Sequence, residues 1–379
     1  MRSKKFIFLA ILLLVLLSQL PFAYRRYKLS RLNAAIQQLN SERKSPPQQS
    51  GFVEYKGVTH VHSFLGGHSS GTFAEIISAA QANQLQFVVM TEHTEKEFDT
   101  AAMTLSGMHG GVLFINGNEV SAANGDRLLV LPDKVSIAAY PEEFKNWDTK
   151  DLNGVEVYNV FTNAKQINPV VAFFDVLWSH RRYPELIFAL YLDRPDQSLY
   201  KWDQALARAR LTATAGNDAH ANIGVTLKDS AGKTLLGIQL DPYETSFRLV
   251  RLHALIEQNK TFDTASLLEA IKPGHCFIAF DFLGDSSGFS FEAENGGERK
   301  IQGDEIALTP ETRLRVQTPV PGRIVLFKDG VVFAEASGVS AKEFPITEPG
   351  VYRVEIYLPQ LGGMVAGKPW IISNPIYVR

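Results

Sequence analysis

The chain contains a single cysteine, Cys276, among its 379 residues. One thiol cannot form an intrachain disulfide or a four-cysteine zinc site, so a metal site would need histidine and carboxylate ligands. An excess of one charge sign is also lacking, because 38 Lys and Arg residues face 40 Asp and Glu residues, for a formal net charge of -2. An extended nucleic-acid-binding surface is therefore not expected. The glycine-rich stretch GGHSSG lacks the lysine of a phosphate-binding loop, which argues against an ATP-type nucleotide site there.

The chain has one long apolar run, FIFLAILLLVLLSQLPFAY, directly after the basic start MRSKK. About 20 apolar residues suffice for a helix to cross a bilayer, so residues 1–28 are predicted to form a membrane anchor. A cleaved signal peptide has the same basic start and apolar middle. Cleavage after Ala23 would put Pro21 where a small residue is expected, which favours an uncleaved anchor. The short N-terminal tail favours a cytoplasmic N-terminus and an extracytoplasmic, periplasmic body.

Residues 29–51 are predicted to be a linker, and residues 52–284 a catalytic body. The first part of the linker can form a short helix with Leu32, Ile36 and Leu39 near one face, before the polar SERKSPPQQSG. In the body, strand-like stretches such as LQFVVMTEH alternate with helical ones such as TFAEIISAAQANQ, which begins with a capping-box pattern. This alternation predicts an α/β fold with a parallel sheet or barrel.

The pattern changes after Gly284. Short strand-like stretches separated by Gly and Pro occupy residues 285–379, and FKDGVVF has the Asp-Gly signal of a hairpin. We expect an antiparallel β-sandwich in this region.

Histidine is scarce, yet three of the nine histidines fall within THVHSFLGGHSSG. Together with two later clusters, TEHTE and GNDAH, and with NGNEVS, the candidate metal ligands are His60, His62, His68, His93, Glu119, Asp218 and His220. Each lies at or just after the predicted C-terminal end of a strand, where α/β barrels build active sites. A pair of histidines alone is as often structural as functional, but the accumulation of seven such residues favours a metal site.

The order of these motifs resembles the PHP (polymerase and histidinol phosphatase) superfamily of metal-dependent phosphoesterases. His-x-His follows the first strand, Glu-His ends the second, Gly-x-Glu follows the third, and Asp-Ala-His comes late. The C-terminal WIISNPIY is similar to a segment of the branch that carries a β-sandwich. The resemblance implies a distorted (β/α)7 barrel and hydrolysis of phosphate esters by metal-activated water.

The same resemblance implies two ligand sets, His60, His62, Glu119 and Asp218 for one metal and His68, His93 and His220 for another. A third family site needs two further histidines, where this chain offers Asp126 or Arg127 and, in AAYPEE, Tyr140. Glu92 also stands where the family often has aspartate, and Ser70-Gly71 stands where many members carry Asp-Gly. Two divalent ions are therefore expected, or one, and the mixed ligands suit Zn²⁺, Mn²⁺ or Fe²⁺.

The expected catalytic residues are Glu119, Asp218 and His93, acting on a small or nucleotide-like phosphate ester. The basic stretch WSHRRYPE offers His180, Arg181 and Arg182 for phosphate binding, although a solvated turn is the alternative. His253 fits a helical apolar pattern and is predicted to pack there without a role in the site. Two other functions stay open: hydrolysis of a carbamate, amide or non-phosphate ester, and metal binding without catalysis.

Overall fold

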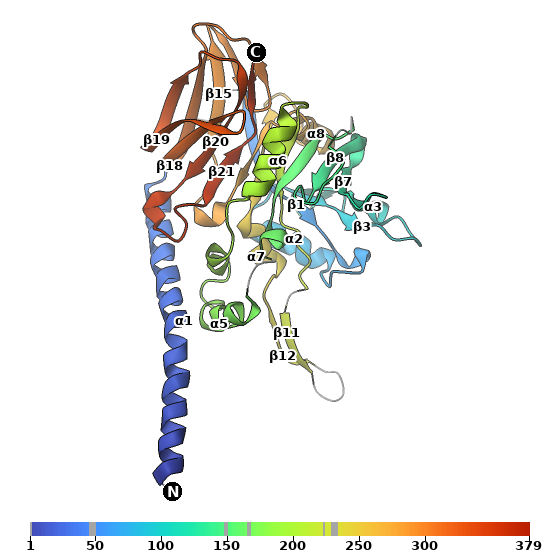
Figure 1. The fold of residues 1–379 in the computed structure, drawn as a ribbon. Helices are drawn as coiled ribbons and strands as arrows, with labels where there is room; N and C mark the ends of the chain where they lie inside the picture. The colour runs from blue at the N-terminus through green and yellow to red at the C-terminus, as the bar shows by residue number, and fades with distance from the viewer. Residues whose placement is uncertain (1, 45–50, 148–150, 165–167, 223, 229–233) are drawn as a thin grey trace.

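The computed structural model describes residues 2–44, 51–147, 151–164, 168–222, 224–228 and 234–379. The fold is mixed α/β, with a strand-rich body from which one long helix projects (Figure 1).

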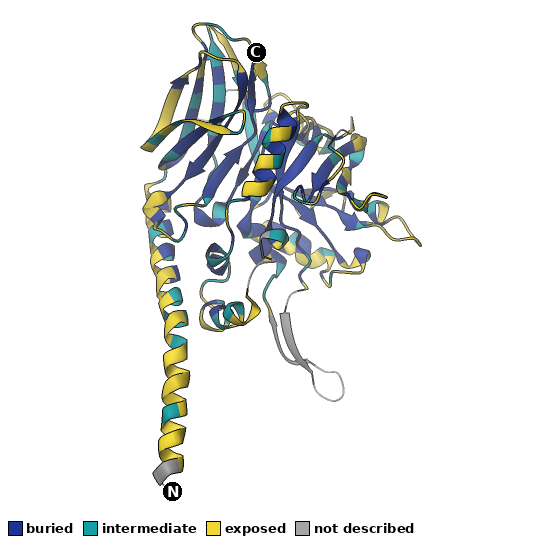
Figure 2. Ribbon diagram, viewed as in Figure 1, coloured by how far each residue is buried: buried dark blue, intermediate teal, exposed yellow. Residues whose placement is uncertain are grey.

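Helix α1 (Arg2–Glu42) is continuous through Pro21 and carries the apolar run at its free end. Most of that run is exposed, whereas Leu29, Leu32, Ile36 and Leu39 are buried against the body (Figure 2). The predicted linker is therefore helical and packed as far as Glu42, and residues 45–50 lie outside the described residues. By length and composition, α1 can serve as a membrane anchor or as a signal sequence.

The first sheet is built around β1 (Phe52–Val61). Strand β1 pairs in parallel with β2 (Phe87–Met90), which pairs in parallel with β5 (Val112–Ile115). On its other side β1 pairs antiparallel with β13 (Arg251–Glu257), and β13 pairs antiparallel with β14 (Cys276–Ala279). A short strand, β4 (Gly107–His109), closes the far edge on β5. The helix predicted around His253 was thus wrong: β13 is buried on both faces, which removes the alternation that identifies a strand.

The second sheet has the order β10-β9-β8-β7-β6-β3. Its strands are β3 (Glu92–His93), β6 (Asn118–Ser121), β7 (Arg127–Leu131), β8 (Val135–Ala139), β9 (Gly154–Asn159) and β10 (Thr212–Gly216). Strands β3 and β6 continue the paths of β2 and β5, and a parallel bridge joins Val61 at the end of β1 to Ala219 just after β10. A path of neighbouring strands therefore leads from β1 to β2, along the chain to β3, across the second sheet to β10, and back to β1 through the Val61–Ala219 bridge. This strand circuit brings the ends of β1, β3, β6 and β10 together.

Further helices lie between these strands along the chain. They are α2 (Phe73–Ala82), α3 (Thr100–Met103), α4 (Val160–Ala164), α5 (Pro169–Ser179), α6 (Asp196–Leu206), α7 (Tyr243–Leu249) and α8 (Thr264–Ile271). The capping box predicted for α2 is present, with Thr72 and Glu75 each accepting a backbone N–H. A separate hairpin joins β11 (Gly224–Lys228) to β12 (Thr234–Gln239).

The C-terminal region consists of strands linked mostly in antiparallel pairs. They are β15 (Ser290–Asn295), β16 (Glu298–Ile301), β17 (Glu305–Ile306), β18 (Arg313–Lys328), β19 (Val331–Pro345), β20 (Gly350–Tyr357), β21 (Pro369–Ser373) and β22 (Ile376–Val378). The predicted Asp-Gly hairpin is confirmed, because Asp329 and Gly330 connect β18 to β19 with φ angles of 52° and 80°. Strand β21 pairs with β14, so one sheet continues across the predicted domain boundary at residue 284.

Candidate metal centre

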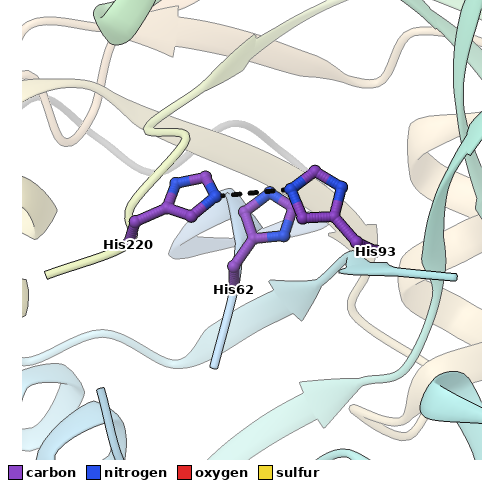
Figure 3. A group of neighbouring side chains, drawn as sticks. All are labelled: His62, His93 and His220. Carbon is purple, nitrogen blue, oxygen red and sulfur yellow. Dashed lines mark hydrogen bonds between the residues drawn. The ribbon is translucent and has the colours of Figure 1, made fainter. Parts of the chain in front are cut away.

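Six of the seven candidate ligands converge where the strand circuit closes. His60 and His62 come from the end of β1, His93 from β3, Glu119 from β6, and Asp218 and His220 from the segment after β10. The imidazoles of His62, His93 and His220 lie together although they come from three distant parts of the chain (Figure 3).

The backbone that presents these groups is unusual. His60, Asp218 and Tyr140 have φ angles of 62°, 48° and 51°, a region that residues with a side chain rarely adopt. The register of β1 against β2 also shifts between Val58 and Val61. Both β1 imidazoles reach the cluster, but from an irregular strand end and not through simple alternation. Local backbone strain of this kind clusters at functional sites.

Four buried polar atoms meet at the centre without a hydrogen-bond partner among the described residues: His60 Nε2, His62 Nε2, Glu119 Oε2 and Asp218 Oδ1. The His60 nitrogen lies 3.5 Å from the Glu119 oxygen and 3.6 Å from the Asp218 oxygen. The His62 nitrogen lies 3.6 Å from each of the same two oxygens. Tetrahedral ligands held about 2.1 Å from a metal ion lie roughly 3.4 Å apart, so these four atoms have the spacing of one coordination shell.

A second group of possible ligand atoms comes from His62, His93 and His220, all within 4.8 Å of one another. The His62 ring centroid lies 4.5 Å from that of His93 and 4.2 Å from that of His220. His93 Nε2 and His220 Nε2 are 3.5 Å apart. His93 Nδ1 also approaches Glu119 Oε2 at 3.3 Å, which links this group to the first. Because His93 and His220 are only partly buried, the second group is the open side of the cluster.

His68 stands at the edge of the cluster. Its side chain is exposed, and its ring centroid is 5.1 Å from that of His93 in an edge-on arrangement. The loop that carries His68 is bound to the segment after β10, because Asn222 Nδ2 donates to the His68 carbonyl at 2.5 Å. Within the described residues, His62 occupies the place in the second group that the resemblance gave to His68.

The electrostatics of the cluster suit a cation. Burial, reinforced by the neighbouring imidazoles, lowers the pKa of His62 well below its usual value, which keeps a lone pair available on one of its nitrogens. Burial alone would also lower the pKa of His60, but the carboxylates of Glu156, Asp218 and Glu119 outweigh it and raise that pKa. Burial opposes ionisation of Glu119, yet His60 and other cationic neighbours lower its pKa to about 2. Two buried carboxylates facing several imidazoles are the donor set of a divalent metal site, and the residues present fit one.

Two supporting residues were missed by the sequence analysis. Glu156 in β9 lies with its Oε2 2.7 Å from His60 Nδ1, and Asn159 donates to Glu156 Oε1 at 2.6 Å and to Asp218 Oδ2 at 3.3 Å. A carboxylate on the outer nitrogen of a ligating histidine fixes its tautomer and orientation. The sequence signal that could have indicated Glu156 was a lone glutamate in the otherwise largely apolar stretch GVEVYN. In the structure all six residues of this strand are buried.

Of the positions expected to form a degenerate third site, Arg127 and Tyr140 contact the carboxylates of the first group, whereas Asp126 does not in the described part of the chain. Asp126 accepts hydrogen bonds from the backbone of Lys145 and Asn146, so its carboxylate holds a loop. Arg127 places Nη1 3.3 Å from Glu119 Oε1, and Tyr140 donates from its hydroxyl to Asp218 Oδ2 at 2.9 Å. Burial, and then the charge of Asp218, raises the pKa of Tyr140, so this residue stays a protonated donor.

Glu92 and Ser70 also have structural contacts. Glu92 accepts from the Ser63 backbone N–H at 2.9 Å and from the Thr104 hydroxyl at 2.7 Å, which fixes the chain between β1 and α2. Ser70 donates to the Ala221 carbonyl at 2.9 Å and holds the His68 loop against the segment after β10.

The predicted phosphate-binding residues separate. His180 lines a cavity whose lining also includes Asp218. Arg181 and Arg182 line another hollow, with Gln19, Arg26 and Trp178, beside α1.

No family model matches the chain, and no curated protein matches it. A crystal structure from Bacteroides vulgatus, described as a two-domain protein containing a predicted PHP-like metal-dependent phosphoesterase, is similar at 14% identity and a TM-score of 0.38. The match covers 88% of this chain and 98% of that one. The structure of PsfC from Pseudomonas syringae is similar at 13% identity and a TM-score of 0.37, over 60% of this chain and 91% of that one. At these TM-scores the likeness is too weak to fix the fold or the chemistry.

Proposed function

We propose that the protein is a membrane-tethered, metal-dependent hydrolase of phosphate esters with a PHP-type site. The observation that carries the proposal is the meeting of four buried atoms, from His60, His62, Glu119 and Asp218, at the spacing of metal ligands. None of the four has a hydrogen-bond partner in the part of the chain that the structure describes. Leaving such groups buried without a partner would cost several kcal/mol, roughly 1–3 for each neutral group and more for a charged one. A bound cation removes that cost.

The fold proposed for this function is a distorted barrel followed by a β-sandwich. The circuit of strand neighbours from β1 to β10 supports the barrel, and the antiparallel pairs of β15 to β22 support the sandwich. In such a barrel the candidate ligands occupy the C-terminal strand ends, which is the usual place of an active site.

Two ions, or one, are proposed: the first held by His60, His62, Glu119 and Asp218, and the second by His68, His93 and His220. The mixture of imidazole and carboxylate ligands favours Zn²⁺, Mn²⁺ or Fe²⁺. Such ions supply a lowered pKa for a bound water and polarisation of a phosphoryl oxygen.

The side chains around this centre have distinct roles. Glu156 orients His60, while Arg127 and Tyr140 each hold the outer oxygen of one central carboxylate. The Arg127 side chain is 43% exposed, so its remaining donors can meet an anionic substrate at the open side. His93 is partly exposed, with its Nδ1 3.3 Å from Glu119 Oε2, and belongs to the ligand set of the second ion.

The apolar end of α1 supports the tether, since it is exposed and long enough to cross a bilayer. The side proposed for the body is the periplasmic one. A reporter enzyme that is active only outside the cytoplasm, fused after Arg379, tests that orientation. Activity is expected, and an inactive reporter would place the body in the cytoplasm.

The test of function is phosphate release by the full-length protein in detergent, with Mn²⁺ or Zn²⁺ added. His62→Ala and Asp218→Asn should each reduce turnover at least about 100-fold, because they remove central ligands. His109→Ala is the matched control, since His109 contacts the Ser106 carbonyl and the Phe114 ring and lies outside the cluster. Equal rates for wild type and His62→Ala would contradict the assigned site.

The same preparations separate the alternatives. Bound metal with turnover of carbamate, amide or carboxylate esters, but not of phosphate esters, would identify a hydrolase of another bond. Bound metal with no turnover of any of these would identify a metal-binding protein.

A further inference from the structure

A cavity of about 360 Å³ opens beside the metal cluster and shares Asp218 with it. Asp218 and His180 are among its polar lining residues, whereas much of its wall is apolar, including Val160, Ile187, Phe188 and Leu249. This volume falls within the roughly 300–1,000 Å³ typical of small-molecule sites. A ligand that fills it would place a polar group at the cluster and an apolar group in the remainder.

Helix α5 forms one wall of this cavity. One face of the helix lines the cavity and another is exposed, and both faces are largely apolar. Pro169, Ala172, Val176 and His180, spaced at helical intervals, line the cavity. Val170, Phe173 and Leu177 lie on another face and are 65%, 55% and 63% exposed. A short helix that exposes large apolar side chains while its inner face lines an apolar cavity is unusual for a surface in water and is typical of a membrane interface.

The position of α5 along α1 supports that reading. Arg25 forms two contacts with the buried Asp175, at 2.8 Å and 2.7 Å, and the Phe22 and Phe174 rings lie 4.9 Å apart. Trp178 Nε1 donates to Gln19 Oε1 at 3.1 Å. These contacts fall at the end of the apolar run nearest the body, which is where a membrane-spanning α1 would leave the bilayer.

The surroundings at this level have the composition of a membrane surface. Arg26, Arg181 and Arg182 line a hollow together with Trp178. Trp and Arg residues concentrate where a protein meets lipid headgroups. The two arginines that the sequence suggested for the substrate thus lie where they can contact the membrane surface.

From these observations we propose that the substrate is an amphiphile, a phosphate ester of a long-chain alcohol, drawn from the bilayer beside α5. Its apolar chain occupies the cavity and its phosphate reaches the cluster at Asp218. Water adds to phosphorus as the ester P–O bond breaks, the alcohol oxygen takes up a proton, and the products are inorganic phosphate and the long-chain alcohol. The chemical step rests on the proposed function, whereas the binding of the chain does not.

The test uses the full-length protein in phosphatidylcholine nanodiscs and a dodecyl phosphonate with a diazirine at the chain end, which hydrolysis does not cleave. Photolabelling should map to the cavity face of α5 and to Ile187 or Leu249. Ala172→Trp, which fills the cavity, should reduce this labelling roughly tenfold. Ala341→Trp makes the same change on exposed strand β19 and should leave it unaltered.

Competition keeps the test valid if Ala172→Trp does not fold. Unlabelled dodecyl phosphonate should suppress cavity labelling of the wild type far more than butyl phosphonate does, because each buried methylene adds to affinity. Labelling confined to the apolar run of α1, or equal competition by the two phosphonates, would overturn the proposal.

Phosphate release is measured separately with dodecyl and butyl phosphate. Cavity labelling without phosphate release from either ester would support the proposed chain-binding site and contradict the proposed hydrolase function. Equal phosphate release from both esters without cavity labelling would support the hydrolase function and contradict the proposal of an amphiphilic substrate.

Discussion

The Nδ1 atom of His60 donates to Oε2 of Glu156 across 2.7 Å, in a site where both side chains are fully buried. This contact turns His60 Nε2 toward Glu119 and Asp218, so a residue of β9 determines how β1 presents its imidazole. Burial raises the pKa of Glu156 and His60 opposes that rise, as expected for a carboxylate held in place by its partner.

Removing the charge of Glu156 should weaken metal binding without removing a ligand. Glu156→Gln is expected to lower metal affinity about 10- to 100-fold, the usual effect of losing such a supporting carboxylate. Competition with a chromogenic chelator measures the change. Glu298→Gln on exposed strand β16 is the matched control, and an unchanged affinity in Glu156→Gln would remove the orienting role.

Replacing Arg127 tests its part in substrate binding. Arg127→Ala should raise KM for an anionic ester roughly tenfold, corresponding to about 1.4 kcal/mol, because one charged donor next to Glu119 is lost. Arg127→Lys should recover part of the loss, since the charge remains but the planar fork does not. An unchanged KM in both variants, measured by steady-state kinetics, would assign Arg127 to structure alone.

A buried ion network away from the metal centre gives a pH dependence of stability. His253 Nδ1 lies 2.6 Å from Glu54 Oε1, and His253 Nε2 lies 3.2 Å from Asp281 Oδ2. Burial would lower the pKa of His253, but Asp281 and Glu54 raise it to about 9 from an ordinary 6.5. The stabilisation is therefore complete below about pH 6.5 and is lost as the pH rises through 9.

At about 1.4 kcal/mol per pKa unit, the free energy of unfolding should fall by about 3 kcal/mol between pH 6 and pH 9.5 through this group. Denaturant titration in detergent at several pH values measures the slope. His253→Gln should flatten it, and His109→Gln should not. A wild-type stability that rises over this interval would contradict the assignment.

A second network ties α6 to β20. Arg353 is buried and contacts Asp203 at 2.8 Å and 2.7 Å, and Glu355 at 2.6 Å. Arg353→Leu leaves the Asp203 carboxylate without its cation, while Glu355 keeps its contact with Arg194. The substitution should lower the free energy of unfolding by about 3–5 kcal/mol. Arg323→Leu removes an exposed pair with Glu335 and should cost less than about 1 kcal/mol in the same denaturation experiment. Similar losses of unfolding free energy in the two variants would show that the buried network stabilises the protein no more than the exposed pair does.

The candidate ligands could be found from sequence because each follows a strand and belongs to a short local motif. Their partners could not, since Glu156 meets His60 and Arg127 meets Glu119 only after strands pair across the sheets. The hairpin at Asp329-Gly330 and the capping box at Thr72 were readable because both are set by local backbone chemistry.

Longer-range packing defeated local patterns elsewhere. His253 lies in a strand buried on both faces, where the apolar run gives no period to separate strand from helix. Residues 29–42 have the composition of a linker and helix start, yet they continue α1 because Leu29, Leu32, Ile36 and Leu39 bury one face against the body.

Anomalous X-ray diffraction from crystals of the protein loaded with Mn²⁺ or Zn²⁺ tests the central claim most directly. The account predicts an anomalous peak among His60 Nε2, His62 Nε2, Glu119 Oε2 and Asp218 Oδ1, at about 2.0–2.2 Å from each. Metal-loaded crystals with no peak at that point, or with the four side chains turned apart, would contradict it.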